Sequence, residues 1–135
     1  MRITRLPAIH HDSNVVVVKG STSNILIDAG TSWYQMLQVE RITGVLGDEK
    51  LDRILLTSRL YPFAGGAKYI SESFDNAPVH IHEEGQAALQ TGDFFTTWAN
   101  RYESDMPPVE TTMVEDGDIF ALGDCEVEAI LMDGI

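Results

Sequence analysis

Four short runs dominated by apolar residues constrain the fold of this chain more than any other feature of its sequence. They occupy residues 15–18, 25–27, 54–56 and 79–81. Apolar residues are continuous in the first three runs, and in the fourth only His80 is polar, so each run is expected to form a β-strand with both faces buried. Segments with helical spacing lie between them, which predicts an α/β fold whose helices cover one face of a sheet.

Capping residues predict where the helices begin and end. A helix over residues 33–46 should start at Thr31 or Ser32 and stop near Gly44 or Gly47. Further helices are predicted over residues 66–74 and 83–90, the second ending at Gly92. Residues 93–108 carry aromatic side chains at spacings of three and four, which favours an amphipathic helix packed on the core over a lid.

Composition indicates one soluble domain over residues 1–135. Hydrophobic residues make up 44% of the chain, enough for a single core. The longest apolar runs have about four residues, far below the ~20 needed to cross a bilayer. The N-terminus lacks the apolar segment of a signal peptide, and the single cysteine, Cys125, is expected to pack as a small apolar side chain. These features predict a cytoplasmic protein without membrane contact.

The net charge of −12 comes from nine Lys and Arg residues against 21 Asp and Glu residues. A field of this sign repels phosphate backbones, so nucleic acid is not an expected partner. The acidic residues are dispersed along the chain, which is typical of a solvated surface or of one adapted to high salt.

Residues 55–66 have the position and the glycines of a metal-binding loop. They run Leu-Leu-Thr-Ser-Arg-Leu-Tyr-Pro-Phe-Ala-Gly-Gly, directly after an apolar strand and directly before a predicted helix. Sites in α/β folds are usually built at such strand ends.

This stretch resembles the metal loop of the metallo-β-lactamase superfamily, which runs Thr-His-x-His-x-Asp-His-x-Gly-Gly. Three flanking positions match that pattern, namely Thr57, Gly65 and Gly66. The four ligand positions hold other residues, namely Ser58, Leu60, Pro62 and Phe63. Leu and Phe offer zinc no lone pair, Pro offers only its backbone carbonyl, and a Ser hydroxyl is a poor ligand beside imidazole. The resemblance implies the family scaffold with a degenerate metal-ligand motif.

Other segments are similar to the superfamily in their order and spacing. Residues 14–30 resemble its opening pair of strands and end in its Asp-x-Gly, and residues 77–84 resemble its strand that turns into a helix. Residues 114–131 resemble its Asp-Gly-Asp hairpin and the following strand. The chain is therefore identified as a member of the superfamily, nearest to the glyoxalase II-like hydrolases.

The superfamily fold is an αββα sandwich of two halves, and this chain resembles the N-terminal half only. The resemblance implies a truncated or half-length domain, with a mixed β-sheet that carries helices on one face. The family's Pro-Gly-His loop falls on Asp133-Gly134-Ile135, again without a histidine.

Few other residues are candidate metal ligands. His80 and His82 lie on one face of their strand, but no third ligand has a zinc-like spacing, so chance occurrence is favoured over a metal pair. His10 and His11 are adjacent and should point to opposite faces of an extended segment.

Two polar residues near the loop have other expected roles. Asp28 matches the family residue that supports the metal loop, where its carboxylate should accept loop amides. Ser58 is not expected to be a nucleophile, because no Gly-x-Ser-x-Gly elbow surrounds it.

The favoured hypothesis is a non-catalytic scaffold without catalytic residues, zinc or another cofactor. Such a scaffold would bind a small molecule or another protein, most readily a second copy of the chain as a dimer. The alternative is a zinc-dependent hydrolase of the superfamily with an atypical or partner-completed site. Metal content of the purified protein distinguishes the two hypotheses.

Overall fold

The computed structural model describes residues 1–132 of the chain. Its strands are β1 (Arg2–Leu6), β2 (Val15–Lys19), β3 (Asn24–Ile27), β4 (Arg53–Leu55), β5 (Val79–His82), β6 (Thr112–Val114), β7 (Ile119–Ala121) and β8 (Glu126–Glu128). Its α-helices are α1 (Gln35–Leu46), α2 (Tyr61–Ala64), α3 (Ala67–Ser73) and α4 (Glu83–Thr91). Two 3-10 helices, η1 (Ser32–Tyr34) and η2 (Ala99–Tyr102), complete the described elements.

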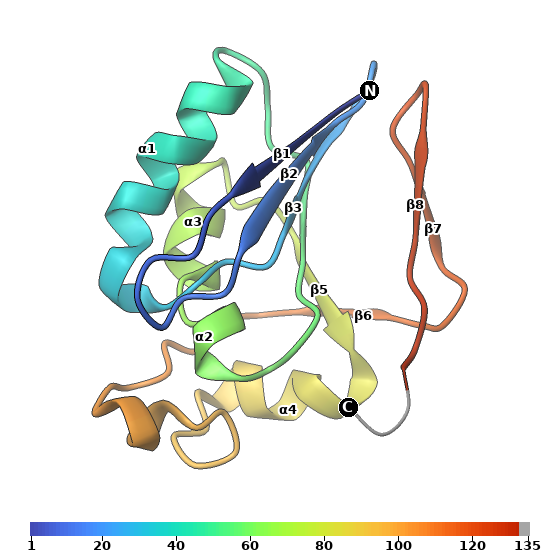
Figure 1. Cartoon of the computed structure of the whole chain (residues 1–135). Coiled ribbons are helices and arrows are strands. Elements are labelled where there is room, and N and C mark those ends of the chain that lie inside the picture. Colours follow the sequence, from blue (N-terminus) through green and yellow to red (C-terminus); the bar gives the residue numbers. More distant parts are fainter. Residues whose placement is uncertain (133–135) are drawn as a thin grey trace.

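The strands form a mixed six-stranded sheet in the order β1-β2-β3-β4-β5-β6. Strands β1, β2 and β3 pair antiparallel, whereas β3, β4, β5 and β6 pair parallel. Each parallel connection passes through helical segments on the same side of the sheet (Figure 1). The predicted mixed sheet with helices on one face is confirmed.

The main hydrophobic core lies between the sheet and these helices. Val15, Val17 and Leu26 point from the sheet into this core and are fully buried. Ile42 of α1 and Ile70 of α3 meet them from the helix side and are equally buried. Because neighbouring strand residues point to opposite faces, the apolar runs also supply the second face of the sheet.

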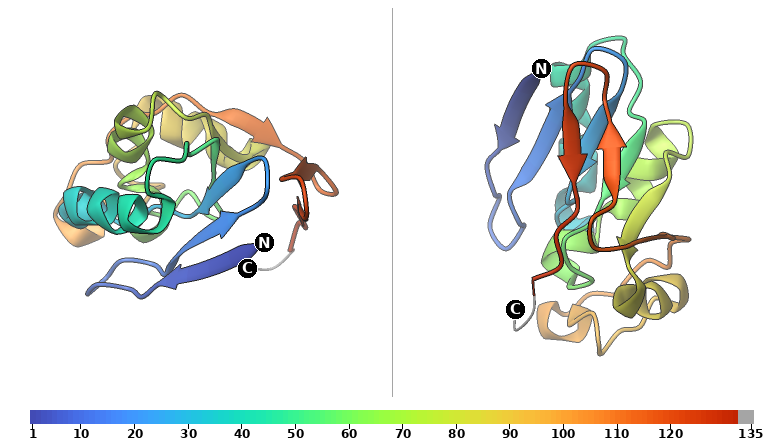
Figure 2. Two further views of the ribbon diagram at one scale, coloured as in Figure 1. Left: turned by 90° about the horizontal axis from the view of Figure 1, so that it is seen from above. Right: turned by 90° about the vertical axis from the view of Figure 1, so that its right-hand side faces the viewer.

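A separate two-stranded hairpin, β7–β8, covers part of that second face. Val18 and Ile25 of the sheet pack against Leu122 in the turn of the hairpin, and all three are buried. In the right-hand view of Figure 2 the hairpin crosses in front of the middle of the sheet and leaves β1 to one side. Ile3 of β1 remains 61% exposed.

The predicted helix ends agree with the structure at two glycines. Gly47 follows α1 with φ +62° and donates its N–H to the carbonyl of Thr43. Gly92 follows α4 in the left-handed region with φ +66°. A glycine adopts this conformation without the Cβ clash that other residues incur, so each helix stops there.

The predicted helix over residues 93–108 is wrong, because only η2 is helical in that segment. Asp93 Oδ1 accepts the backbone N–H groups of Phe95 and Thr96, which forms a turn in place of a helical start. Trp98 and Glu103 bound η2 with positive φ angles of 64° and 53°. Phe95 is 68% exposed, so the aromatic side chains of this segment do not form the expected core stripe.

Two further differences concern the ends of the chain. Strand β1 was not among the predicted elements, although it adds a full edge strand to the sheet. The Asp-Gly-Asp segment, Asp116 to Asp118, was expected to form a hairpin turn. It links β6 to β7, which do not pair, and the hairpin turn lies between β7 and β8 at residues 122–125.

The predicted third ligand loop at residues 133–135 lies outside the described residues. Within residues 1–132, no helix has the length and apolarity required to span a bilayer.

Candidate functional site

Residues 55–66, the loop that resembles the family's metal loop, lie at the carboxyl edge of the parallel strands. The loop leaves β4 after Leu55, turns through α2 and enters α3 at Ala67. Residues 28–34 follow the neighbouring strand β3 and lie at the same edge. Residues 93–105, orange in Figure 1, lie at this end of the molecule beside α2. Several loops therefore converge where an α/β fold usually carries its site.

Asp28 holds the start of this loop. Its Oδ1 accepts the backbone N–H of Thr57 at 2.8 Å, and its Oδ2 accepts the Thr57 hydroxyl at 2.7 Å. Its backbone has φ +65°, a conformation that Asp tolerates better than most residues. Burial raises the pKa of Asp28 to about 6, although both hydrogen bonds from Thr57 act in the opposite direction.

The four positions that align with the family's ligands use their oxygen atoms for hydrogen bonds within the fold. Ser58 Oγ accepts the backbone N–H of Leu60 at 3.0 Å. The carbonyl of Leu60 accepts the backbone N–H of Phe63 at 2.9 Å. The carbonyls of Pro62 and Phe63 accept N–H groups from other loops.

These two carbonyls bind the loop to its neighbours. The Pro62 carbonyl accepts the backbone N–H of Ser13 at 2.9 Å, and the Phe63 carbonyl accepts that of Ala29 at 2.8 Å. Pro62 is buried, whereas the side chains of Leu60 and Phe63 are half-buried. The positions that would hold ligands in the family therefore serve packing and loop–loop hydrogen bonding here.

Tyr61 is the central residue of the loop, and sequence reasoning missed it. Its ring is fully buried, and its hydroxyl is hydrogen-bonded to Ser32 Oγ and to Ser104 Oγ, the latter at 2.8 Å. Its backbone N–H donates to the carbonyl of Thr97 at 2.7 Å. Tyr61 thus joins three loops, a role that its place between two ligand positions did not indicate.

Aromatic rings surround Tyr61 at this edge. Trp33 lies with its ring centroid 6.0 Å from that of Tyr61, and Tyr102 lies 5.8 Å from it. His11 meets both Trp33 and Tyr102, with centroid distances of 6.1 and 5.6 Å. Trp33 is 46% exposed and His11 is exposed, so part of this aromatic cluster faces solvent.

Asp12 is a second buried carboxylate at the same edge. It accepts hydrogen bonds from the backbone N–H of Thr31, at 3.1 Å, and from the Thr31 hydroxyl. Gln38 Nε2 lies 3.5 Å from its other oxygen. Gly30 is required beside it, because a Cβ there would lie 2.5 Å from Asp12 Oδ2.

The two loop glycines allow close backbone packing. A Cβ at Gly65 would lie 2.6 Å from the Tyr61 ring, and one at Gly66 would lie 2.8 Å from the carbonyl of Ala29. Both glycines are therefore needed for the loop to turn into α3 at this distance from its neighbours.

The histidines considered as metal ligands contact other groups. His80 Nε2 lies 3.1 Å from Arg53 Nη1, and His82 Nδ1 accepts the backbone N–H of Glu84 at the start of α4. His10 stacks on Tyr34 with a centroid distance of 5.5 Å. Burial, followed by the charge of Arg53, lowers the pKa of His80. Neither His80 nor His82 lies in the loop of residues 55–66.

The donor set does not fit the zinc that the fold family implies. Across residues 1–132, no three His, Cys, Asp or Glu side chains gather so as to hold a metal ion. Asp28, the acid beside the loop, uses both carboxylate oxygens on Thr57. A zinc site needs three or four such ligands converging at about 2 Å.

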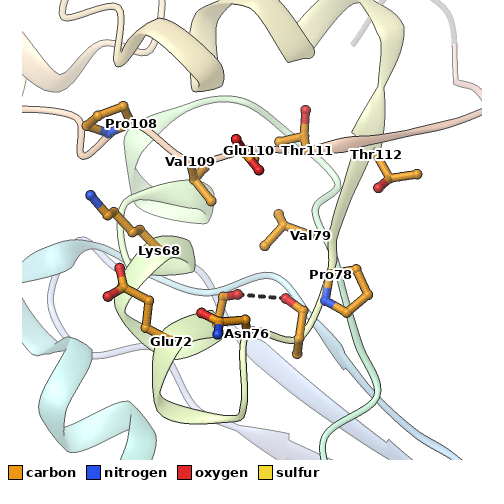
Figure 3. A pocket seen from close by; sticks show the side chains of 12 residues that line it. Lys68, Glu72, Asn76, Pro78, Val79, Pro108, Val109, Glu110, Thr111 and Thr112 are labelled. Carbon is orange, nitrogen blue, oxygen red and sulfur yellow. Dashed lines mark hydrogen bonds between the residues drawn. The ribbon is translucent and has the colours of Figure 1, made fainter.

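A groove of about 600 Å³ lies away from this edge, near the amino ends of β5 and β6 (Figure 3). Val79 and Val109 are among the residues that line it, and Lys68 and Glu72 of α3 lie along one side. It is not part of the loop site.

Comparison with known proteins gives a family match, a related protein and similar solved structures. The sequence pattern of the metallo-beta-lactamase superfamily matches residues 9–127. Acyl-coenzyme A thioesterase MBLAC2 from Gallus gallus is 27% identical over 143 residues, which cover 90% of this chain and 50% of the relative. The chain thus spans about half the length of the curated relative it matches.

Solved structures agree with this match at the level of the fold. A metallo-beta-lactamase from Cronobacter sakazakii superposes with a TM-score of 0.73 at 22% identity, covering 89% of this chain and 46% of that one. FEZ-1 from Legionella gormanii superposes with a TM-score of 0.74 at 18% identity, covering 90% of this chain and 47% of that one. The family match extends over most of the chain and the same fold is present, so the chain belongs to the metallo-beta-lactamase superfamily.

Proposed function

We propose that this protein is a non-catalytic member of the superfamily, a scaffold that acts by binding. One observation carries the proposal. At the four positions where the family loop carries ligands, the only side-chain oxygen is the hydroxyl of Ser58. That hydroxyl already accepts the backbone N–H of Leu60. Without metal-bound water, the family's hydrolytic chemistry has no nucleophile at this edge.

The exposed part of the aromatic cluster is the proposed contact surface for a small molecule. Trp33, His11 and Tyr102 present ring faces and edges above the buried Tyr61. Such rings favour planar or apolar groups and organic cations, and the net charge of −12 favours cations over anions. The same charge opposes binding of nucleic acid.

The second proposed partner is another copy of this chain. The hairpin covers the middle of the second sheet face, and Ile3 on β1 stays exposed beside it. In the family's αββα sandwich a second half covers this face, and a second copy placed there would restore the layering in a two-fold dimer.

The alternative function is hydrolysis at a site completed by another chain or segment. The observation that favours it is the relative named as an acyl-coenzyme A thioesterase, of which this chain spans half. In that case the missing ligands would come from outside the described residues, and the aromatic cluster would face the substrate.

An activity assay separates the two functions. The purified protein is incubated with an acyl-coenzyme A thioester and with a β-lactam, before and after incubation with zinc, and the chicken thioesterase serves as a positive control for the thioester. The proposal predicts turnover at the buffer rate in every condition. Zinc-dependent turnover of either substrate would contradict it and support the alternative.

A further inference from the structure

Three side chains connect the β7–β8 hairpin to the second face of the sheet. His80 on β5 packs edge-on against Phe120 on β7, with ring centroids 5.4 Å apart. The guanidinium of Arg53 on β4 lies over the same Phe120 ring, 5.5 Å from its centroid. Arg53 Nη1 and His80 Nε2 are 3.1 Å apart, so the three groups form one cluster.

The contact with Arg53 fixes the protonation of His80. A guanidinium only donates hydrogen bonds, so Nε2 of His80 must accept, and the imidazole is neutral with its proton on Nδ1. His80 is 4% exposed, and its Nδ1 has no hydrogen-bond partner among the described residues. A second proton on Nε2 would make this nitrogen a donor that faces the N–H donors of Arg53. It would also place a positive charge beside the guanidinium.

We propose that Arg53, His80 and Phe120 form a pH-sensitive clasp, in which neutral His80 holds the hairpin on the sheet and protonated His80 loosens it. When Nε2 gains a proton, Arg53 has to move away from it. The guanidinium rests on Phe120, so this movement breaks the cation–π contact with the hairpin as well. The part of the apolar second face next to His80, which includes Leu55 of β4, then becomes accessible.

The other charged groups near His80 do not cancel this effect. Asp118, before β7, favours the protonated form, but burial and the charge of Arg53 outweigh it and lower the pKa of His80. His82 lies on the same face of β5, two residues away. Val127 of β8 pairs with Phe120 and faces the sheet, so its neighbours Glu126 and Glu128 lie on the outer side of the hairpin.

The turn end of the hairpin is held independently of His80. The carbonyl of Leu122 accepts the backbone N–H of Thr22 at 2.9 Å, and Asp124 Oδ1 accepts that of Ser21 at 2.9 Å. The proposal therefore predicts loosening about this anchored turn, with the six-stranded sheet intact.

Hydrogen exchange measured by mass spectrometry tests the clasp, after correction for the intrinsic effect of pH. As pH falls from about 6.5, the ordinary pKa of histidine, to the lowered pKa of His80, amides of residues 119–128 should lose up to about tenfold in protection per pH unit relative to those of β2–β4, and the loss should level off below that. His80→Gln keeps an acceptor for Arg53 and does not titrate, so its hairpin should stay protected throughout. His82→Gln should behave as the wild type.

A second measurement keeps the test decisive if His80→Gln does not fold. The ring signals of His80 are titrated by NMR in the wild-type protein, and their midpoint should lie below 6.5 and coincide with the loosening of the hairpin. The clasp is overturned if hairpin protection relative to the sheet does not change with pH. It is also overturned if His80→Gln loosens as the wild type does, or if the two midpoints differ by more than about one unit.

Discussion

At the scale of single residues, Asp28 shows how a buried carboxylate is kept in this fold. It combines burial, a left-handed backbone and two hydrogen bonds from Thr57. Unpaired burial of a charge costs several kcal/mol, and the two bonds offset part of that cost. The part of the desolvation cost that is not offset raises the pKa of Asp28 from its ordinary value of 3.8 to about 6.

This pKa makes the stability of the loop depend on pH. Between about pH 4 and about pH 6 the folded state binds more protons than the unfolded state, so the contribution of Asp28 to stability is lost as pH rises through that window. Asp28→Asn removes the titration and keeps one acceptor and one donor for Thr57. Urea unfolding should show the variant gaining about 2 to 3 kcal/mol relative to wild type from pH 4 to pH 7.

Asp75→Asn is the matched control for this prediction. Asp75 also has a positive φ, of 54°, but it is exposed. Its substitution measures the effect of replacing Asp by Asn at an exposed position with positive φ. If the Asp28→Asn difference changes with pH no more than the Asp75→Asn difference, Asp28 is ionised in the folded state without a desolvation cost.

Tyr61 gives the second prediction at this scale. Tyr61→Phe removes the hydroxyl that Ser32 and Ser104 share, and it leaves both serines without that partner. The free energy of unfolding should fall by about 1 to 2 kcal/mol. Tyr69→Phe, at a tyrosine that is 36% exposed, should change it by less than about 0.5 kcal/mol. Equal effects of the two substitutions in urea unfolding would contradict the central role of Tyr61.

At the scale of elements, the buried strands and most helices follow from sequence, whereas β1 and residues 93–105 do not. Strand β1 carries exposed Arg2, Ile3 and Arg5, so it lacks the apolar run that identifies the inner strands. Trp98 and Glu103 adopt left-handed angles that aromatic spacing does not reveal.

In the candidate site, too, sequence predicts one important residue and misses another. Asp28 could be predicted because it matches a family position, and the structure places it against the loop. Tyr61 could not, because its importance arises from contacts with residues distant in sequence, at Thr97 and Ser104. Long-range partners of this kind leave no local pattern in the chain.

Histidines placed at three of the positions that align with the family's ligands test how residues 55–66 contribute to packing. The combined variant Ser58→His, Leu60→His and Phe63→His removes two half-buried apolar side chains and the Ser58 hydrogen bond. Its free energy of unfolding, measured in urea without metal, should be about 1 to 2 kcal/mol lower than that of wild type. Lys68→His, on the exposed side of α3, is the control and should have little effect. A fully stable triple variant would show that the loop does not contribute to packing.

Substitution of Gly20 tests how the β7–β8 hairpin is attached, and substitution of Gly44 is the control. A Cβ at Gly20 would lie 2.2 Å from the carbonyl of Leu122, so Gly20→Ala should lower the free energy of unfolding by about 1 to 3 kcal/mol. Gly44 in α1 has nothing within 4 Å of such a Cβ, so Gly44→Ala should raise it by about 0.5 to 1 kcal/mol. Thermal unfolding of both variants checks the two signs. A neutral Gly20→Ala would mean that the hairpin turn is not seated against residues 20–23.

At the scale of the whole molecule, the second face of the sheet decides whether copies associate. The β7–β8 hairpin buries its middle, which leaves less apolar surface than the bare strands would present. Repulsion between two chains of charge −12 opposes a dimer and is screened by salt.

We therefore expect dimerisation to strengthen as salt is raised. Light scattering at micromolar concentration should give a mass above the monomer value of 14.9 kDa at moderate salt. Ile3→Lys, on the exposed part of the second face, should return the protein to a monomer, whereas Met36→Lys on α1 should not. A monomer at every salt concentration would rule out this mode of association.

We propose that the loop edge does not hold a metal ion. Elemental analysis of the purified protein, before any zinc is added, tests it most directly. The account predicts far less than one zinc or iron per chain, and no change in the unfolding temperature when a chelator is present. One or more tightly bound transition metal ions per chain, released together with a loss of stability by the chelator, would contradict it.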